Sequence, residues 1–247
     1  MKQMNSGRTL GIALAVLAVL TYIFISWAQN ALPADAAALS ALESDDLVMV
    51  KEDSGLITFE PVSASYDTGF IFYPGGRVDY RAYAPVLHRI AARGYFVALV
   101  PVPLNLAFFN TNAASQVMEL YPEIDHWVVG GHSLGGVTSA SYAADHLDEV
   151  AGLVLWASYP PGKALADSDI RAVVVYGTND MEGTTQIDLV NERLPTGTPF
   201  ITIEGGNHAQ FGSYGPQPGD RPATISYEEQ WQQATDITVE FIESLSP

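Results

Sequence analysis

The feature that most constrains the fold of this chain is the hexapeptide Gly-His-Ser-Leu-Gly-Gly at residues 131–136. It follows an apolar run, His126–Gly130, that is typical of a buried strand, and a helical pattern begins directly after it at Val137. A Gly-x-Ser-x-Gly turn between a strand and a helix is so sharp that its serine adopts a strained backbone conformation. The glycines on either side let the strand and the helix approach where a Cβ would collide. We therefore predict that Ser133 projects above the edge of a sheet, next to the unpaired N–H groups that begin a helix.

Short apolar runs alternate with amphipathic stretches from residue 46 onward. We predict strands at 47–50, 56–59, 69–73, 95–100, 126–129, 150–156, 170–176 and 200–203, and helices at 80–93, 112–120, 137–146, 184–194 and 227–245. A turn at Asp53-Ser54-Gly55 joins the first two strands as an antiparallel hairpin. The remaining alternation of strand and helix predicts an α/β fold with a mostly parallel sheet that helices cover on both faces.

An uncharged apolar run, Leu10–Ala28, precedes this region. Its 19 residues approach the roughly 20 that a helix needs to span a bilayer. Lys2 and Arg8 lie before it, and this positive flank is expected to stay in the cytoplasm. We therefore expect a cytoplasmic segment at 1–9, a transmembrane signal anchor at 10–28, a tether at 29–45 and an extracytoplasmic domain at 46–247. The alternative is a cleaved signal peptide and a secreted protein, although the apolar core of a signal peptide is commonly only about 7–15 residues long.

The composition excludes several classes of function. Acidic residues outnumber basic ones by 28 to 11, so the surface should repel nucleic acid and anionic headgroups. Cysteine is absent, which excludes thiolate catalysis and cysteine-type zinc sites. The sequence has no nucleotide-binding glycine fingerprint and no metal-ligand spacing of His, Asp and Glu, so we expect no cofactor and no metal.

The strand, the Gly-x-Ser-x-Gly turn and the helix together resemble the nucleophile elbow of the α/β-hydrolase superfamily. The sequence Tyr-Pro-Gly-Gly at 73–76 is similar to the oxyanion loop of its small, lidless, esterase-like members. The resemblance covers residues 46–245 and implies an α/β-hydrolase fold. In this fold a lid domain commonly follows the strand at 150–156, but residues 157–169 leave no room for one, so we expect an open site.

The resemblance also implies a catalytic triad in the chain order serine, acid, histidine. Ser133 takes the position of the nucleophile. His208 takes that of the base, because it follows the last strand in a Gly-Gly-Asn-His loop. Asp180 takes that of the acid, because it follows the strand at 170–176 at the usual short distance. Glu182 is the nearest alternative acid, and Asp188 is disfavoured because it falls on a predicted helix.

The same resemblance places an oxyanion hole at two backbone N–H groups. One is the N–H of Leu134, after the nucleophile, and the other is that of Gly76, with Arg77 as the alternative. Pro74 departs from the family pattern, in which a histidine precedes the two glycines. Apolar residues at or after the carboxyl ends of strands are expected to line a substrate pocket, although they fit core packing equally well. These residues are Leu106, Phe108, Trp156, Tyr159 and Met181.

These features together predict a serine hydrolase that cleaves a carboxylic ester, or a related acyl bond, of a small-molecule substrate through an acyl-enzyme on Ser133. Amides, thioesters and lactones are not distinguished from esters by the sequence, and the oligomeric state stays open. The alternative is a non-catalytic, membrane-tethered binding domain with the same fold. The presence of a suitable residue at every triad position favours the enzyme.

Overall fold

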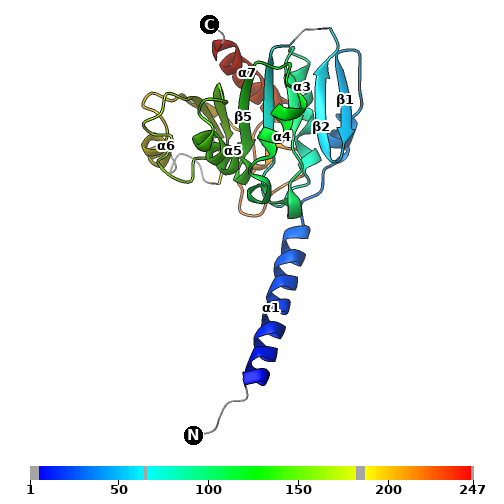
Figure 1. Cartoon of the computed structure of the whole chain (residues 1–247). Coiled ribbons are helices and arrows are strands. Elements are labelled where there is room, and N and C mark those ends of the chain that lie inside the picture. The colour runs from blue at the N-terminus through cyan, green and yellow to red at the C-terminus, as the bar shows by residue number, and fades with distance from the viewer. Residues whose placement is uncertain (1–5, 64–65, 182–186, 246–247) are drawn as a thin grey trace.

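The computed structural model describes residues 6–63, 66–181 and 187–245. One sheet with helices on both faces forms the body, and a single long helix projects from one end of it (Figure 1). The strands are β1 (Val48–Asp53), β2 (Leu56–Pro61), β3 (Thr68–Tyr73), β4 (Phe96–Leu99), β5 (His126–His132), β6 (Gly152–Trp156), β7 (Arg171–Gly177) and β8 (Phe200–Ile203). The predicted α/β fold is confirmed.

The strands are ordered β1-β2-β4-β3-β5-β6-β7-β8 across the sheet. β1 and β2 form the predicted antiparallel hairpin, and β2 runs antiparallel to β4. The other six strands, β3 to β8, are all parallel to one another. Tyr73 of β3 pairs with Gly131 of β5, and His132 of β5 pairs with Trp156 of β6. This register brings the carboxyl ends of three neighbouring strands level, so the loops that follow them meet at one edge.

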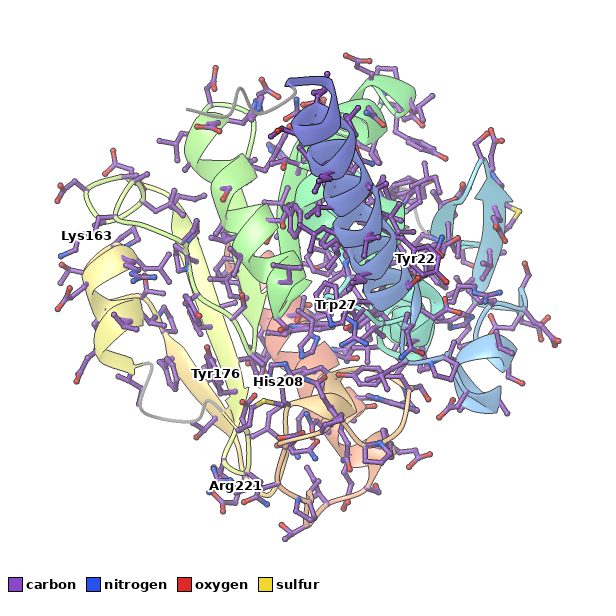
Figure 2. The ribbon with its side chains drawn as sticks, turned by 90° about the horizontal axis from the view of Figure 1, so that it is seen from below. Tyr22, Trp27, Lys163, Tyr176, His208 and Arg221 are labelled. Atoms are coloured by element: carbon purple, nitrogen blue, oxygen red, sulfur yellow. The ribbon has the colours of Figure 1, made fainter. Side chains whose placement is uncertain are left out.

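Helices cover the two faces of the sheet. The α-helices of the body are α2 (Ala36–Ser40), α3 (Ala84–Ala91), α4 (Ala113–Leu120), α5 (Leu134–Asp145), α6 (Ile187–Arg193) and α7 (Tyr227–Leu245), and short 3₁₀ helices include η1 (Tyr80–Tyr83), η2 (Pro103–Asn105), η3 (Ala107–Asn110) and η5 (Ala209–Phe211). α3 packs against α7 on one face, and α5 lies against β5 on the other (Figure 2). The helix predicted at 80–93 begins as the 3₁₀ turn η1, and Pro85 then lies at the start of α3, where its missing N–H removes no helical bond.

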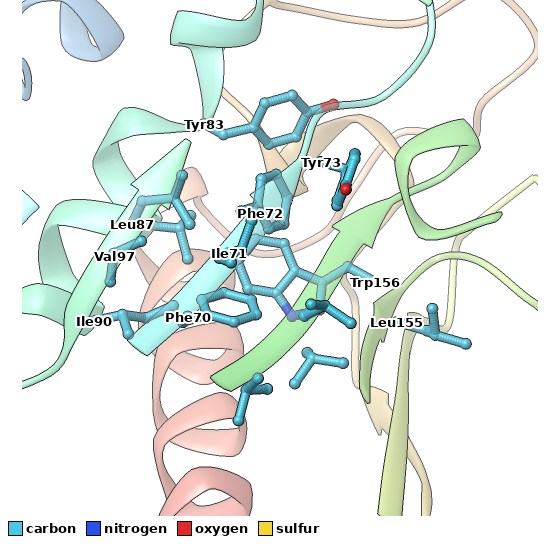
Figure 3. Packing of buried hydrophobic residues seen from close by; sticks show 14 of the residues in the cluster. Phe70, Ile71, Phe72, Tyr73, Tyr83, Leu87, Ile90, Val97, Leu155 and Trp156 are labelled. Atoms are coloured by element: carbon cyan, nitrogen blue, oxygen red, sulfur yellow. The ribbon is translucent and has the colours of Figure 1, made fainter. Parts of the chain in front are cut away.

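An aromatic cluster fills the core below the carboxyl ends of the strands (Figure 3). The indole of Trp156 packs against Phe72 with 4.8 Å between ring centroids, and against Phe211 at 5.8 Å. Its N–H donates to the Thr238 hydroxyl of α7 at 3.2 Å, which satisfies the one polar group that this side chain buries. The loops of the upper edge therefore rest on a packed aromatic layer.

The N-terminal helix α1 (Ser6–Gln29) projects away from the body (Figure 1). Its segment Thr9–Gln29 is long and apolar enough to cross a membrane, because an 18-residue stretch of it has a mean hydropathy of 2.3 and none of that stretch is buried against the protein. Ala28, near the end of the helix, is buried. A signal sequence has the same properties.

The segment 29–45, which the sequence predicted as a tether, folds onto the body. Leu32 forms a parallel bridge with Val78, and Asp35 begins α2 by accepting from the N–H groups of Ala37 and Ala38. Ala38 is completely buried. The connection between α1 and the body is therefore ordered by backbone hydrogen bonds and packing.

Candidate active site

Ser133 lies in the sharp turn between β5 and α5. Its backbone has φ 51° and ψ −120°, a strained conformation for any residue that carries a Cβ. Its N–H donates to the Trp156 carbonyl at 3.0 Å, and the Ser158 hydroxyl donates to the Ser133 carbonyl at 2.7 Å. Two bonds from β6 and the loop after it thus fix the turn, and the partly exposed serine stands at the sheet edge.

The glycines of the turn let three elements meet. A Cβ on Gly131 would lie 2.5 Å from the Gly135 carbonyl carbon, and a Cβ on Gly135 would collide with the carbonyl oxygens of Tyr73 and Pro74. Any larger residue would therefore push the start of α5 away from the end of β3. This close approach brings Leu134 next to the loop that follows β3.

His208 and Asp180 form a buried pair. The loop after β8 carries His208, the turn after β7 carries Asp180, and His208 Nδ1 lies 3.0 Å from Asp180 Oδ2. Their side chains are only 3% and 0% exposed. A carboxylate at Nδ1 holds the proton on that nitrogen and leaves Nε2 as the basic atom of the ring. Arg221 supports the turn by donating to the Asp180 carbonyl at 2.9 Å.

The two alternative acids have different outcomes. Glu182 lies outside the described residues. Asp188 is exposed on α6, as the predicted helix implied. Of the two candidate acids that the structure describes, Asp180 is the one that lies beside His208.

The His208–Asp180 pair lies beside the serine turn. The ring of His132, the residue that precedes Ser133, is centred 4.5 Å from the ring of His208. Figure 2 looks onto this edge of the sheet and labels His208. The structure thus gathers Ser133 after β5, Asp180 after β7 and His208 after β8 at the end of the sheet where the parallel strands finish.

A buried hydrogen-bonded chain that the sequence did not reveal supports this edge. The Tyr83 hydroxyl accepts from the Gly75 N–H at 3.1 Å and lies 2.8 Å from His132 Nδ1. Burial lowers the pKa of His132 well below its usual value, so a neutral ring shares this hydrogen bond with the tyrosine hydroxyl. The sequence gives His132 no role of its own, and Tyr83 stands among apolar helix positions, so no local pattern marks the link.

The loop after β3 lies against the start of α5. A Cβ on Gly76 would be 2.8 Å from Cδ2 of Leu134 and 3.3 Å from its Cβ, so only glycine fits there without a shift. Leu134 is the first residue of α5, where backbone N–H groups have no partner within the helix. The N–H of Arg77, the alternative oxyanion donor, is occupied, because it donates to the Asn105 carbonyl at 2.7 Å.

The five residues expected to line a pocket have different environments. Tyr159 lines a small cleft of about 180 Å³ together with Ser133 and Leu134. Leu106 is buried beside Gly76, Phe108 is half-exposed, and Met181 is partly exposed after Asp180. Trp156 lies completely buried in the core instead of lining the cleft.

No group of three or more His, Asp or Glu side chains is arranged to hold a metal ion within residues 6–63, 66–181 and 187–245.

A model of the alpha/beta hydrolase family matches residues 69–232, about two thirds of the chain. Among curated proteins, the pimeloyl-[acyl-carrier protein] methyl ester esterase of Photorhabdus laumondii is 38% identical over 81 residues. The match covers 33% of this chain and only 29% of that relative.

Solved structures share the fold at low sequence identity. A thermophilic esterase of Thermogutta terrifontis with propionate bound has a TM-score of 0.58 and 14% identity, over 81% of this chain and 95% of that one. A predicted CIB-like hydrolase of Thermoplasma acidophilum has a TM-score of 0.55 and 15% identity, over 80% and 99% of the two chains. At these identities the likeness shows the fold alone.

Proposed function

Because the chain belongs to the alpha/beta hydrolase family, we propose that it is a serine esterase that cleaves carboxylic esters through an acyl-enzyme on Ser133. The observation that supports this most is the buried Asp180–His208 pair beside a strained serine turn. A serine hydroxyl is a weak nucleophile and needs a base beside it, and a buried imidazole held by a carboxylate supplies one. A site that only binds a ligand needs neither this pair nor a strained serine.

The proposed reaction has two steps, acylation of Ser133 and hydrolysis of the acyl-enzyme, and the same residues act in both. His208 Nε2 accepts the proton of the Ser133 hydroxyl as its oxygen attacks the acyl carbon, and Asp180 stabilises the imidazolium. The Leu134 and Gly76 N–H groups hold the negative oxygen of the tetrahedral intermediate. The imidazolium then protonates the leaving alcohol. Water repeats the sequence on the acyl-enzyme and releases the carboxylic acid.

The relatives support an ester rather than another acyl bond. The partial curated match is a methyl ester esterase, and the Thermogutta neighbour is an esterase that holds propionate. The cleft at Ser133, about 180 Å³, is smaller than the roughly 300–1,000 Å³ of most ligand pockets. It suits the acyl carbon and its nearest methylenes rather than a whole large substrate.

We also propose that α1 anchors the enzyme in a membrane, with the body on the extracytoplasmic side. The apolar segment Thr9–Gln29 and the basic residues Lys2 and Arg8 before its apolar core support this topology. A secreted protein released by signal cleavage is the other possible fate of the same segment.

Covalent labelling and turnover test the proposed esterase. Ser133→Ala should abolish labelling by a fluorophosphonate and lower kcat on an activated ester by on the order of 10⁴–10⁶, and His208→Ala should lower kcat about as far. Asp180→Asn should lower it by on the order of 10⁴, because the imidazole is misoriented. Ser141→Ala is the matched control, because that hydroxyl donates within α5, to the Val137 carbonyl.

Circular dichroism checks that each variant folds. Labelling that persists in the folded Ser133→Ala protein would refute Ser133 as the nucleophile. A wild-type protein that is neither labelled nor active on any ester would favour the non-catalytic binding domain.

A further inference from the structure

The end of α1 is fastened to the loop that carries the proposed oxyanion donor. Arg77, next to Gly76, donates from Nε to the Trp27 carbonyl at 3.0 Å and from a terminal nitrogen to the Asn30 carbonyl at 2.9 Å. Its guanidinium also lies 4.6 Å from the centre of the Trp27 ring. Asn105 donates to the Ala28 carbonyl at 3.2 Å. The last turn of α1 has no basic residue of its own, so Arg77 supplies the positive charge that a helix C-terminus favours.

Because of these contacts, the apolar helix α1 ends directly against the loops around the candidate active site. Ala28 is completely buried by the body, whereas large apolar side chains of α1 from Leu10 to Trp27 are exposed. The 21 residues of Thr9–Gln29 extend about 31 Å at 1.5 Å per residue, which matches a hydrocarbon core of about 30 Å. A bilayer around α1 would therefore end near Trp27, and tryptophan is enriched at that depth.

Two exposed aromatic side chains continue this surface onto the body. Phe108 and Phe109 of η3 are 49% and 48% exposed, and their rings are 4.5 Å apart. Phe109 meets Phe24 of α1 edge-on, with 6.3 Å between ring centroids. Phe24 lies about one turn before Ala28, on the membrane side of the boundary. η3 therefore sits at the depth where the hydrocarbon begins.

From this placement we propose that the mouth of the active site faces the bilayer and takes esters of membrane lipids. The proposal rests on the proposed esterase and on the proposed membrane anchor. The ester carbonyl of a glycerolipid lies near the headgroup boundary, the level that Trp27 and Arg77 mark. The acyl chain stays in the bilayer beside Phe108 and Phe109, and only the carbonyl and its nearest carbons enter the small cleft at Ser133. Figure 2 views the molecule along this direction, with Trp27 and His208 labelled.

Orientation is tested in the full-length protein reconstituted into phosphatidylcholine vesicles. The chain has no cysteine, so Phe109→Cys provides a single site for an environment-sensitive fluorophore. Leu147→Cys is the matched control, because Leu147 is 45% exposed and follows α5 at the opposite edge of the sheet. We expect brominated phosphatidylcholine to quench the label at 109 at least about threefold and the label at 147 hardly at all.

Substrate class is tested with two esters of one leaving group, 4-nitrophenyl palmitate dissolved in the vesicles and 4-nitrophenyl butyrate in the water. Phe109→Ser should lower the ratio of palmitate to butyrate hydrolysis by about threefold or more, and Leu147→Ser should leave that ratio unchanged. A label at 109 that brominated lipid does not quench overturns the orientation, whether or not the protein hydrolyses esters. Quenching at 109 with hydrolysis of neither ester instead overturns the esterase, and the lipid substrate with it.

Discussion

The Tyr83 hydroxyl offers a sharp test of how the core supports the active-site edge. Tyr83→Phe removes one oxygen and keeps the ring, which packs against Phe72 with 5.1 Å between centroids and against His132 at 5.6 Å. No cavity forms, so the substitution isolates two hydrogen bonds. The Gly75 N–H loses its acceptor, and His132 Nδ1 loses its hydrogen-bond partner.

Both of these groups are buried, so the effect on stability is large for the loss of a single atom. A buried polar group without a partner costs about 1–3 kcal/mol, and two such groups predict that the free energy of unfolding falls by about 2–6 kcal/mol. Gly75 precedes Gly76, the proposed oxyanion donor. Removal of such a donor costs on the order of 10²–10³ in kcat, so a displaced loop should lower kcat by at least about tenfold.

Chemical denaturation in detergent micelles, followed by tryptophan fluorescence, measures the change in stability. Tyr142→Phe is the control, because its hydroxyl bonds the Ser115 hydroxyl at 2.8 Å in a partly exposed contact between α4 and α5. We expect it to lose less than about 1 kcal/mol and to keep its kcat. If Tyr83→Phe is as stable and as active as the control, the buried chain from Gly75 to His132 does not support the site.

Two further predictions concern pH and topology. The pKa of His132 is lower in the folded protein than its value of about 6.5 in the unfolded chain. The contribution of His132 to stability is therefore complete above about pH 6.5 and is lost below it by up to about 1.4 kcal/mol per pH unit. His132→Gln should lose stability less steeply than the parent between about pH 6.5 and 5, and equal slopes would mean that His132 is protonated in the folded protein. A phosphatase that is active only after export should be active when it is fused to the C-terminus, and the fusion protein should stay with the membrane. An inactive fusion contradicts the proposed topology. Activity released into the medium favours a cleaved signal peptide.

The sequence by itself determined the architecture because strands and helices leave local, periodic patterns. The apolar run of 69–73 is β3 at Thr68–Tyr73, and the stretch of 227–245 is α7 at the same bounds. The turn at 131–136 also acts locally, since its glycines and serine need only the strand before it and the helix after it. The strained φ of Ser133 was expected for this reason.

Tertiary structure alone decided which side chains meet across the sheet edge. Trp156 was grouped with a substrate pocket because it ends a strand, but side chains alternate between the faces of a sheet, and this one points into the aromatic core. Tyr83 and His132 are 49 residues apart, and no spacing in the chain foretells their hydrogen bond. The hydrogen bonds from Arg77 to the end of α1 likewise join segments that are distant in the chain, so composition could not predict them.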